Sequence, residues 1–298
     1  MDKVYVDTVR LLLEAAPEVF RAPHFALKGG TALNLFIQDM PRLSVDIDVV
    51  YTDHHKSRAE ALAEIGRELN EVGEQLKAFR LDAQVTSTKD GDETKLLVRS
   101  GNILVKVEVN HVFRGTLLSP EPRRLVERAR SAFTMDVVLP VLATPEVYGG
   151  KLVAAMDRQH PRDLYDVRAM YASNGLTPQI IECFVCYLAG HNRPIHEVLF
   201  SRDLAMDSIF EEEIQGMTRE DVPLSELVLT RSRLRKDINE QITDSQKQFL
   251  VSLANADPDW SLIPIIHLQE LPAIRWKLQN LQKLKKSTLA SSSIKRMN

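Results

Sequence analysis

The stretch ALKGGTALNLFIQDMPRLSVDIDVVY, residues 26–51, decides the expected fold of this 298-residue chain. Near its end, apolar residues alternate with two acids: Val45, Asp46, Ile47, Asp48 and Val49. A period of two predicts a β-strand with one apolar face and one face that carries both carboxylates. Two neighbouring carboxylates repel each other, and a cation with a preference for oxygen ligands relieves that repulsion. We therefore expect Asp46 and Asp48 to bind Mg²⁺, or Mn²⁺ in its place.

Two glycines, Gly29 and Gly30, open a helical pattern in the first half of the same stretch. Glycine lets the backbone approach a ligand closely, and the N-terminus of a helix favours an anion. A phosphate-binding turn beside a metal-binding acid pair is the equipment for phosphoryl or nucleotidyl transfer. The alternative is a half-buried hairpin strand with two solvated aspartates.

The order Gly-Gly-Thr-Ala-Leu, a short helix, then Arg-x-Ser-x-Asp-Ile-Asp resembles the DNA polymerase β-like nucleotidyltransferase superfamily. Within it, the similarity is to the AbiEii/AbiGii toxin group, which includes the MenT toxins. Thr31 stands where serine is common in that superfamily, and its separation from Asp46 is at the long end. The resemblance implies an α+β fold: a nucleotidyltransferase-type mixed sheet with flanking helices, followed by a mainly helical C-terminal lobe.

A shift in composition places the domain boundary near residue 140. A proline-rich and charged segment, residues 120–130, precedes the apolar run of residues 137–142. We expect residues 1–140 to form the catalytic domain and residues 141–298 to form a helical domain that closes the nucleotide cleft.

A third carboxylate is implied by the resemblance, on a strand beside the one that carries the acid pair. Residues 103–110 alternate strictly, which predicts a strand whose polar face holds Lys106, Glu108 and Asn110. Glu108 is the acid on a later strand that is placed to be the third metal ligand. The alternative is a plain surface strand with a polar face.

Lys151 followed by Arg-Asp-Leu-Tyr-Asp at residues 162–166 looks like the second signature of the same toxin group. The resemblance implies that Lys151 contacts the phosphates of the nucleotide and that an acid of the pair Asp163 and Asp166 is needed for activity. Asp163 lies near an expected helix N-terminus, so it could equally be only a partner of the helix dipole.

The expected site combines these residues. Two Mg²⁺ ions would lie between Asp46, Asp48 and Glu108 and activate an acceptor hydroxyl. The β- and γ-phosphates of an NTP would be held by the residues Gly29, Gly30, Thr31 and Lys151. Arg42 is expected to brace the acid strand or a phosphate, and Ser44 to share the face of the carboxylates.

The function implied by the resemblance is a toxin that transfers NMP from an NTP to an acceptor hydroxyl. The implied acceptor is the 3′ end of tRNA, and the implied partner is a separate antitoxin. Three alternatives stay open: a small-molecule transferase such as an antibiotic adenylyltransferase, an enzyme that transfers NMP or phosphate to a protein hydroxyl, and a non-catalytic nucleotide-binding module.

The composition of the chain limits where it could bind a polyanion. A net charge of −3 means that a polyanion site must be a local patch, and the basic residues near the C-terminus are a candidate: Lys277, Lys283, Lys285, Lys286, Lys295 and Arg296. A solvated, frayed terminus is the alternative.

Two cysteines suit a reducing cytoplasm, and no apolar run reaches the ~20 residues that a membrane span needs. We expect Cys183 and Cys186 to be core residues. We expect His54-His55 to lie in a solvated loop, or else at the rim of the site.

Overall fold

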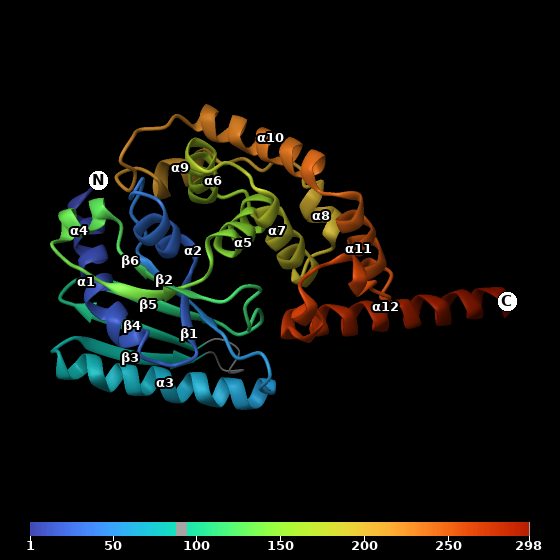
Figure 1. Cartoon of the computed structure of the whole chain (residues 1–298), viewed down its shortest axis with the longest axis horizontal. Coiled ribbons are helices and arrows are strands. Elements are labelled where there is room, and N and C mark those ends of the chain that lie inside the picture. Colours follow the sequence, from blue (N-terminus) through green and yellow to red (C-terminus); the bar gives the residue numbers. More distant parts are fainter. Residues whose placement is uncertain (88–93, 298) are drawn as a thin grey trace.

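The computed structural model of the chain describes residues 1–87 and 94–297, with the side chains of Ser87 and of residues 287–297 outside the description. The polar sequence Lys89-Asp90-Gly91-Asp92 also predicts a turn between two strands, and this turn lies outside the described residues, as do the side chains of Lys295 and Arg296. Figure 1 shows two lobes, with the sheet and its helices in one and a curved array of helices in the other.

A mixed sheet is the centre of the first lobe, and its described strands follow the order β3-β4-β5-β2-β1-β7-β6. The strands are β1 (Phe25–Lys28), β2 (Asp46–Tyr51), β3 (Asp82–Ser87), β4 (Thr94–Ser100), β5 (Ile103–Asn110), β6 (Glu121–Arg124) and β7 (Val138–Val141). β2 is parallel to β5 and antiparallel to β1, while β7 is parallel to β1. The sheet is thus mixed, as the resemblance implied.

Helices α1 (Lys3–Val19) and α3 (Arg58–Ala78) pack on one face of the sheet and against each other (Figure 1). Their apolar residues recur every three or four positions, which predicts one buried stripe on each helix. Ser57 begins α3 with a capping box in which Glu60 is the reciprocal partner. The opposite side of the sheet is left for the glycine turn and the helical lobe.

The glycine turn comprises α2 (Gly29–Thr31) and the π-helical turn η1 (Ala32–Ile37), and a short helix α4 (Glu127–Phe133) follows β6. The acid strand begins at Asp46, one residue after its apolar alternation starts at Val45. Residues 42–43 pair elsewhere: Arg42 bridges Thr218, and the Leu43 amide donates to the Met217 carbonyl at 2.8 Å.

The second lobe is helical, as the resemblance implied. Its elements are α5 (Thr144–Asp157), α6 (Pro161–Ser173), α7 (Pro178–Gly190), α8 (Ile195–Leu199), α9 (Asp207–Glu213), α10 (Leu224–Gln241), α11 (Asp244–Ala254), the 3₁₀ turns η2 (Trp260–Leu262) and η3 (Ile266–Glu270), and α12 (Pro272–Met297). Helix α5 packs between α6 and α7, and α12 packs on α7 before projecting away from the body (Figure 1).

The division near residue 140 falls just before the end of β7, which pairs with β1. One later segment returns to the first lobe, because the Asp2 amide donates to the Gly216 carbonyl at 2.7 Å. The two-domain division remains a prediction. Strand β6 was not expected, since Pro122 and two arginines resemble a linker; its pairing with β7 is a tertiary effect.

Candidate active site

The three candidate metal ligands lie together on the open side of the sheet. Asp46 and Asp48 are two residues apart on β2, and Asp48 is the direct register partner of Glu108 on the parallel strand β5. All three line a cavity of about 1390 Å³ that extends from the sheet to the helical lobe. Burial and the neighbouring Asp48 raise the pKa of Asp46 above its ordinary value, with a smaller contribution from Glu108.

This donor set fits a divalent cation with a preference for oxygen. Asp46, Asp48 and Glu108 line the same cavity, and the charges of Asp48 and Glu108 raise the pKa of Asp46, a repulsion that a bound cation would relieve. Glu108 also pairs with Lys95 at 3.0 Å across the adjacent strand, and its side chain is 40% exposed. The Glu108 carboxylate is therefore accessible from solvent.

The glycine turn approaches the acids so closely that no side chain fits there. Gly29 adopts a φ of 71°, and a Cβ atom at this position would overlap the carboxylate of Asp48. A Cβ at Gly30 would lie 2.8 Å from Oγ of Ser44. Both glycines and Ser44 line the cavity. Any group bound by the amides of this turn would thus lie next to the carboxylates.

The Thr31 hydroxyl does not have the partner that was expected. Its side chain is fully buried, and its hydroxyl donates to the main-chain carbonyl of Asp46 at 2.5 Å. The hydroxyl was expected to hold a phosphate, but this bond uses it to fix the start of the acid strand against the glycine turn. The expectation failed because position along a motif does not reveal which way a short side chain points.

A buried ionic cluster lies beside the turn and joins the lobes. Arg42 donates two hydrogen bonds to Asp166, both at 2.7 Å. Lys151 lies 2.8 Å from Asp163 and 2.9 Å from Asp166, and Arg158 donates to Asp163 at 2.5 and 3.0 Å. Burial by itself would raise the pKa of both carboxyls. Arg42 and Lys151 nevertheless hold the pKa of Asp166 below its ordinary value, and Lys151 and Arg158 do so for Asp163.

The cluster shows what the second-signature residues Lys151, Asp163 and Asp166 contact. Lys151 borders the cavity but is only 8% exposed, and its ammonium is held by two carboxylates. Asp163 is more than a helix-dipole partner, since it contacts two cations directly. Asp166 is completely buried and faces cations and Asn34. The arrangement suits the two aspartates for holding positive groups at the edge of the cavity.

Among the charged residues of the cavity that were not anticipated from the sequence, Lys28 and Glu146 lie nearest the sheet. Lys28 is the register partner of Asp48, and burial lowers its pKa although the charge of Asp48 opposes that shift. Glu146 is completely buried and accepts the amides of Leu117 at 2.8 Å and Leu118 at 3.0 Å. Burial raises the pKa of Glu146 to about 7. Lys28 could have been noticed as the first polar residue after the apolar run of β1, whereas Glu146 looked like an ordinary first-turn acid.

The far wall of the cavity comes from the helical lobe and combines basic and apolar groups. Its members include Arg158, Arg162, His196, Phe200, Lys247, Val251, Trp276 and Leu284. The Trp276 side chain is 57% exposed, and that of Phe200 is 69% exposed. Aromatic faces beside cations are suited to stacking against bases that are not paired.

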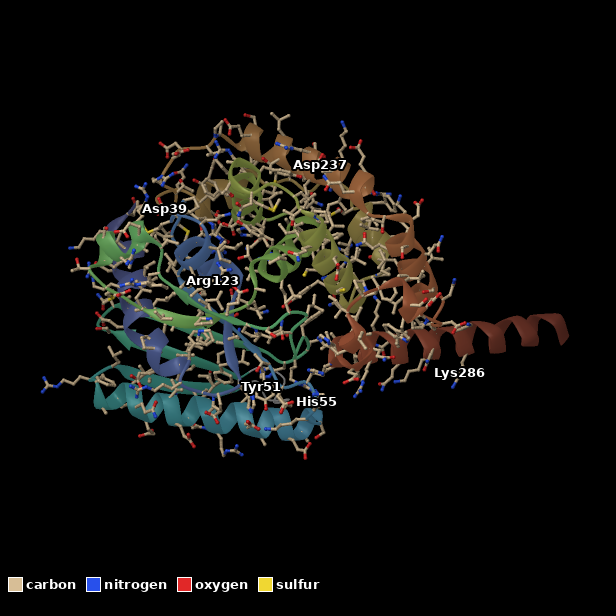
Figure 2. The ribbon with its side chains drawn as sticks, viewed as in Figure 1. Asp39, Tyr51, His55, Arg123, Asp237 and Lys286 are labelled. Carbon is tan, nitrogen blue, oxygen red and sulfur yellow. The ribbon has the colours of Figure 1, made fainter. Side chains whose placement is uncertain are left out.

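The basic C-terminal patch is smaller than the sequence indicates. Lys277 is 8% exposed and donates to the carbonyls of His191 at 2.8 Å and Arg193 at 2.7 Å, so its ammonium caps a loop. Lys285 donates to the Asn255 carbonyl at 3.0 Å. Lys283 and Lys286 are exposed on α12, where Figure 2 labels Lys286 on its projecting part.

Two minor expectations can be compared with the structure. Cys183 and Cys186 are buried free thiols within the core, which confirms their expected role. His54 and His55 lie outside the residues that line the large cavity, beside Glu270 of η3. No helix within the described residues is long and apolar enough to cross a membrane.

The comparisons with known proteins agree with this geometry. Residues 10–280 match the family described as nucleotidyl transferase AbiEii toxin, type IV toxin–antitoxin system. Among solved structures, the chain is similar to MenT4, a nucleotidyltransferase toxin from Mycobacterium tuberculosis, with a TM-score of 0.61 and 20% identity over 94% of this chain and 95% of that one. A comparison with curated proteins gave no match. Because the family match spans most of its length, this chain belongs to the AbiEii nucleotidyltransferase toxin family.

Proposed function

We propose that this protein transfers NMP from an NTP to an acceptor hydroxyl, with the 3′ end of tRNA as the acceptor and a cognate antitoxin as its restraint. The observation that carries the proposal is the juxtaposition of Asp46, Asp48 and Glu108 with the Gly29-Gly30 turn in one large cavity. Carboxylates for metal and amides for phosphate lie within reach of the same ligand.

Asp46, Asp48 and Glu108 would hold Mg²⁺, which when bound lowers the pKa of an attacking hydroxyl and neutralises the leaving pyrophosphate. The amides of Gly29 and Gly30 would orient the phosphates. This turn approaches Asp48 so closely that it has room for glycine but not for a residue with a side chain. Ser44 lines the same part of the cavity and would contribute its hydroxyl.

The cations of the cavity would position the negatively charged nucleotide. Lys28 is half-buried between the acid strand and Glu146, so its ammonium would approach a phosphate at short range. Lys151 and Arg158 would present positive charge from the helical lobe while Asp163 and Asp166 hold their side chains in place. On this view the two aspartates are positioning residues, and activity depends on them through the cations that they fix.

An RNA acceptor is supported by the size and lining of the cavity. A volume of about 1390 Å³ exceeds the roughly 300–1,000 Å³ usual for a small-molecule site. Its outer wall carries Trp276 and Phe200 for stacking, with Lys247 and Arg162 for the backbone charge. A small antibiotic would leave this wall unused.

The experiment is to incubate the purified full chain with each labelled NTP, Mg²⁺ and total RNA, and to separate the products by gel. We expect one label to enter a band of tRNA size, and the folded Asp46→Ala variant to leave it empty. Exposed Asp82 on β3 supplies the control Asp82→Ala, which should label RNA normally. Label found only in a small molecule or in a protein would show that the acceptor is that molecule and not RNA. If no product carries the label, the proposal that this protein transfers NMP is wrong.

A further inference from the structure

A second group of potential metal ligands lies at the opposite side of the first lobe from the buried ionic cluster, where that lobe meets η3. Nε2 of His54 lies 3.7 Å from Oε2 of Glu270, and Nδ1 of His55 lies 4.0 Å from the same oxygen. The three candidate ligand atoms all lie within 4.8 Å of one another. Figure 2 labels His55 at the end of the first lobe that faces the start of α12.

His54 is held in position by its surroundings, yet one nitrogen of its ring is unused. Nε2 of His54 is buried and has no hydrogen-bond partner in the described part of the chain. The His54 ring stacks on His267 with centroids 5.6 Å apart, and its Cβ packs so tightly against Gly115 that a Cβ there would lie 2.8 Å away. A buried, unbonded nitrogen is costly unless something binds it.

His55 and Glu270 are able to complete a site around that nitrogen. Their side chains are 75% and 42% exposed, so both can move without disturbing the core. Asp53 accepts the main-chain amide of His55 at 2.9 Å, which fixes the turn that presents the two imidazoles. His267 is already engaged, because its Nε2 lies 2.8 Å from the Thr116 carbonyl oxygen.

We propose that His54, His55 and Glu270 bind a zinc ion that links the two lobes. Two imidazole nitrogens and one carboxylate oxygen suit zinc, whereas Mg²⁺ prefers a set made of oxygens. Ligand bonds of about 2.0–2.2 Å at tetrahedral angles place ligand atoms roughly 3.3–3.6 Å apart. The observed 3.7 and 4.0 Å, within an overall spread of 4.8 Å, must contract, and the exposed side chains of His55 and Glu270 permit that movement around the fixed His54 ring.

The location gives the ion a structural consequence. His54 and His55 belong to the loop after the acid strand β2, and Glu270 belongs to the turn that precedes α12. Helix α12 carries Trp276 on the outer wall of the large cavity. A zinc bridge would therefore fix that wall relative to the strand of Asp46 and Asp48. The site is separate from the acid trio and does not depend on the proposed transfer reaction.

The test uses the metal-stripped full chain with Mg²⁺ in excess, and Co²⁺ as a spectroscopic probe for zinc. We expect one equivalent of Co²⁺ to give visible absorption bands of a low-coordinate nitrogen and oxygen site, and Zn²⁺ to abolish them. At a Zn²⁺ concentration of 100 times Kd, the unfolding equilibrium constant should fall about 100-fold.

Single substitutions test which residues bind the Co²⁺ ion. His54→Ala should lose the bands, and Glu270→Gln should weaken Co²⁺ binding at least tenfold while leaving the circular dichroism unchanged, since its side chain is partly exposed. His24→Ala alters a histidine outside the cluster, and Asp46→Ala alters the acid trio; both should bind Co²⁺ normally. Absence of the bands in the wild-type chain, or their persistence in both His54→Ala and Glu270→Gln, would overturn the proposal and leave a simple histidine–glutamate contact.

Discussion

Arg42 and Asp166, which are 124 positions apart in the sequence, form a buried bidentate ion pair with both N–O distances at 2.7 Å. Arg42 precedes the acid strand, and Asp166 lies on α6 of the helical lobe. Their side chains are 4% and 0% exposed. The pair therefore fixes the cations of the helical lobe relative to the carboxylates of the sheet.

Asp166→Ala should reduce stability as well as activity. The change leaves Arg42 and Lys151 with less compensation inside the protein, and breaking a buried pair in this way costs about 3–5 kcal/mol. Urea unfolding measures the loss, and the labelled-RNA assay measures activity. A variant as stable as wild type would show that water or a rearranged side chain replaces the carboxylate, and that the pair does not join the lobes.

Asp46→Ala should reduce activity without reducing stability. Removal of one carboxylate relieves repulsion from Asp48, so the free energy of unfolding in chelator should stay the same or rise. Activity should fall on the order of 10²–10³, the usual cost of one preorganised electrostatic contact. Expression of the wild type, but not of this variant, should arrest growth. Growth arrest that persists with the folded variant would mean that the harm comes from binding alone.

Gly29→Ala should abolish nucleotide binding in Mg²⁺. The new methyl would displace the Asp48 carboxylate, and the positive φ disfavours alanine. Gly101→Ala is the matched control, because Gly101 has a φ of 59° but nothing within 4 Å of the added Cβ. Both variants should lose similar backbone stability, while only the first loses NTP affinity in calorimetry. Equal affinities would exclude contact between the turn and the nucleotide.

Lys28→Met should raise the KM for NTP about 10- to 100-fold, the value of one charge-assisted hydrogen bond of roughly 1.5–3 kcal/mol. Stability should not fall, since burial already disfavours the ammonium and lowers its pKa. Lys77 is exposed on α3, so Lys77→Met is the control and should change neither quantity. An unchanged KM in steady-state kinetics would assign Lys28 to balancing Asp48 and Glu146 only.

Glu146 should make stability depend on pH between its two pKa values. Its pKa rises from 4.5 when unfolded to about 7 when folded, so the native state retains the proton over that window. The wild type should accordingly lose about 2–3 kcal/mol of unfolding free energy between pH 5 and pH 8, relative to Glu146→Gln. The variant loses one hydrogen-bond acceptor, which lowers its unfolding free energy by the same amount at every pH and adds no pH dependence of its own. Parallel curves in urea unfolding would contradict the assigned shift.

The sequence by itself determined the acid strand, the glycine turn and the helical character of the second half. These are local properties: alternation places Asp46 and Asp48 on one face, and paired glycines permit the tight turn. The apolar alternation of residues 103–110 also placed Glu108 on a polar strand face. The family followed from the same motifs, because they recur in a fixed order.

The tertiary structure alone decided which side chains meet. Register set Glu108 against Asp48 and Lys28 against the same residue, and no local pattern encodes register between distant strands. Burial turned Lys151 and Asp166 into members of one ionic cluster, and it directed the Thr31 hydroxyl away from the cavity. Contacts of this kind depend on how the lobes pack, and packing energy is a property of the whole chain.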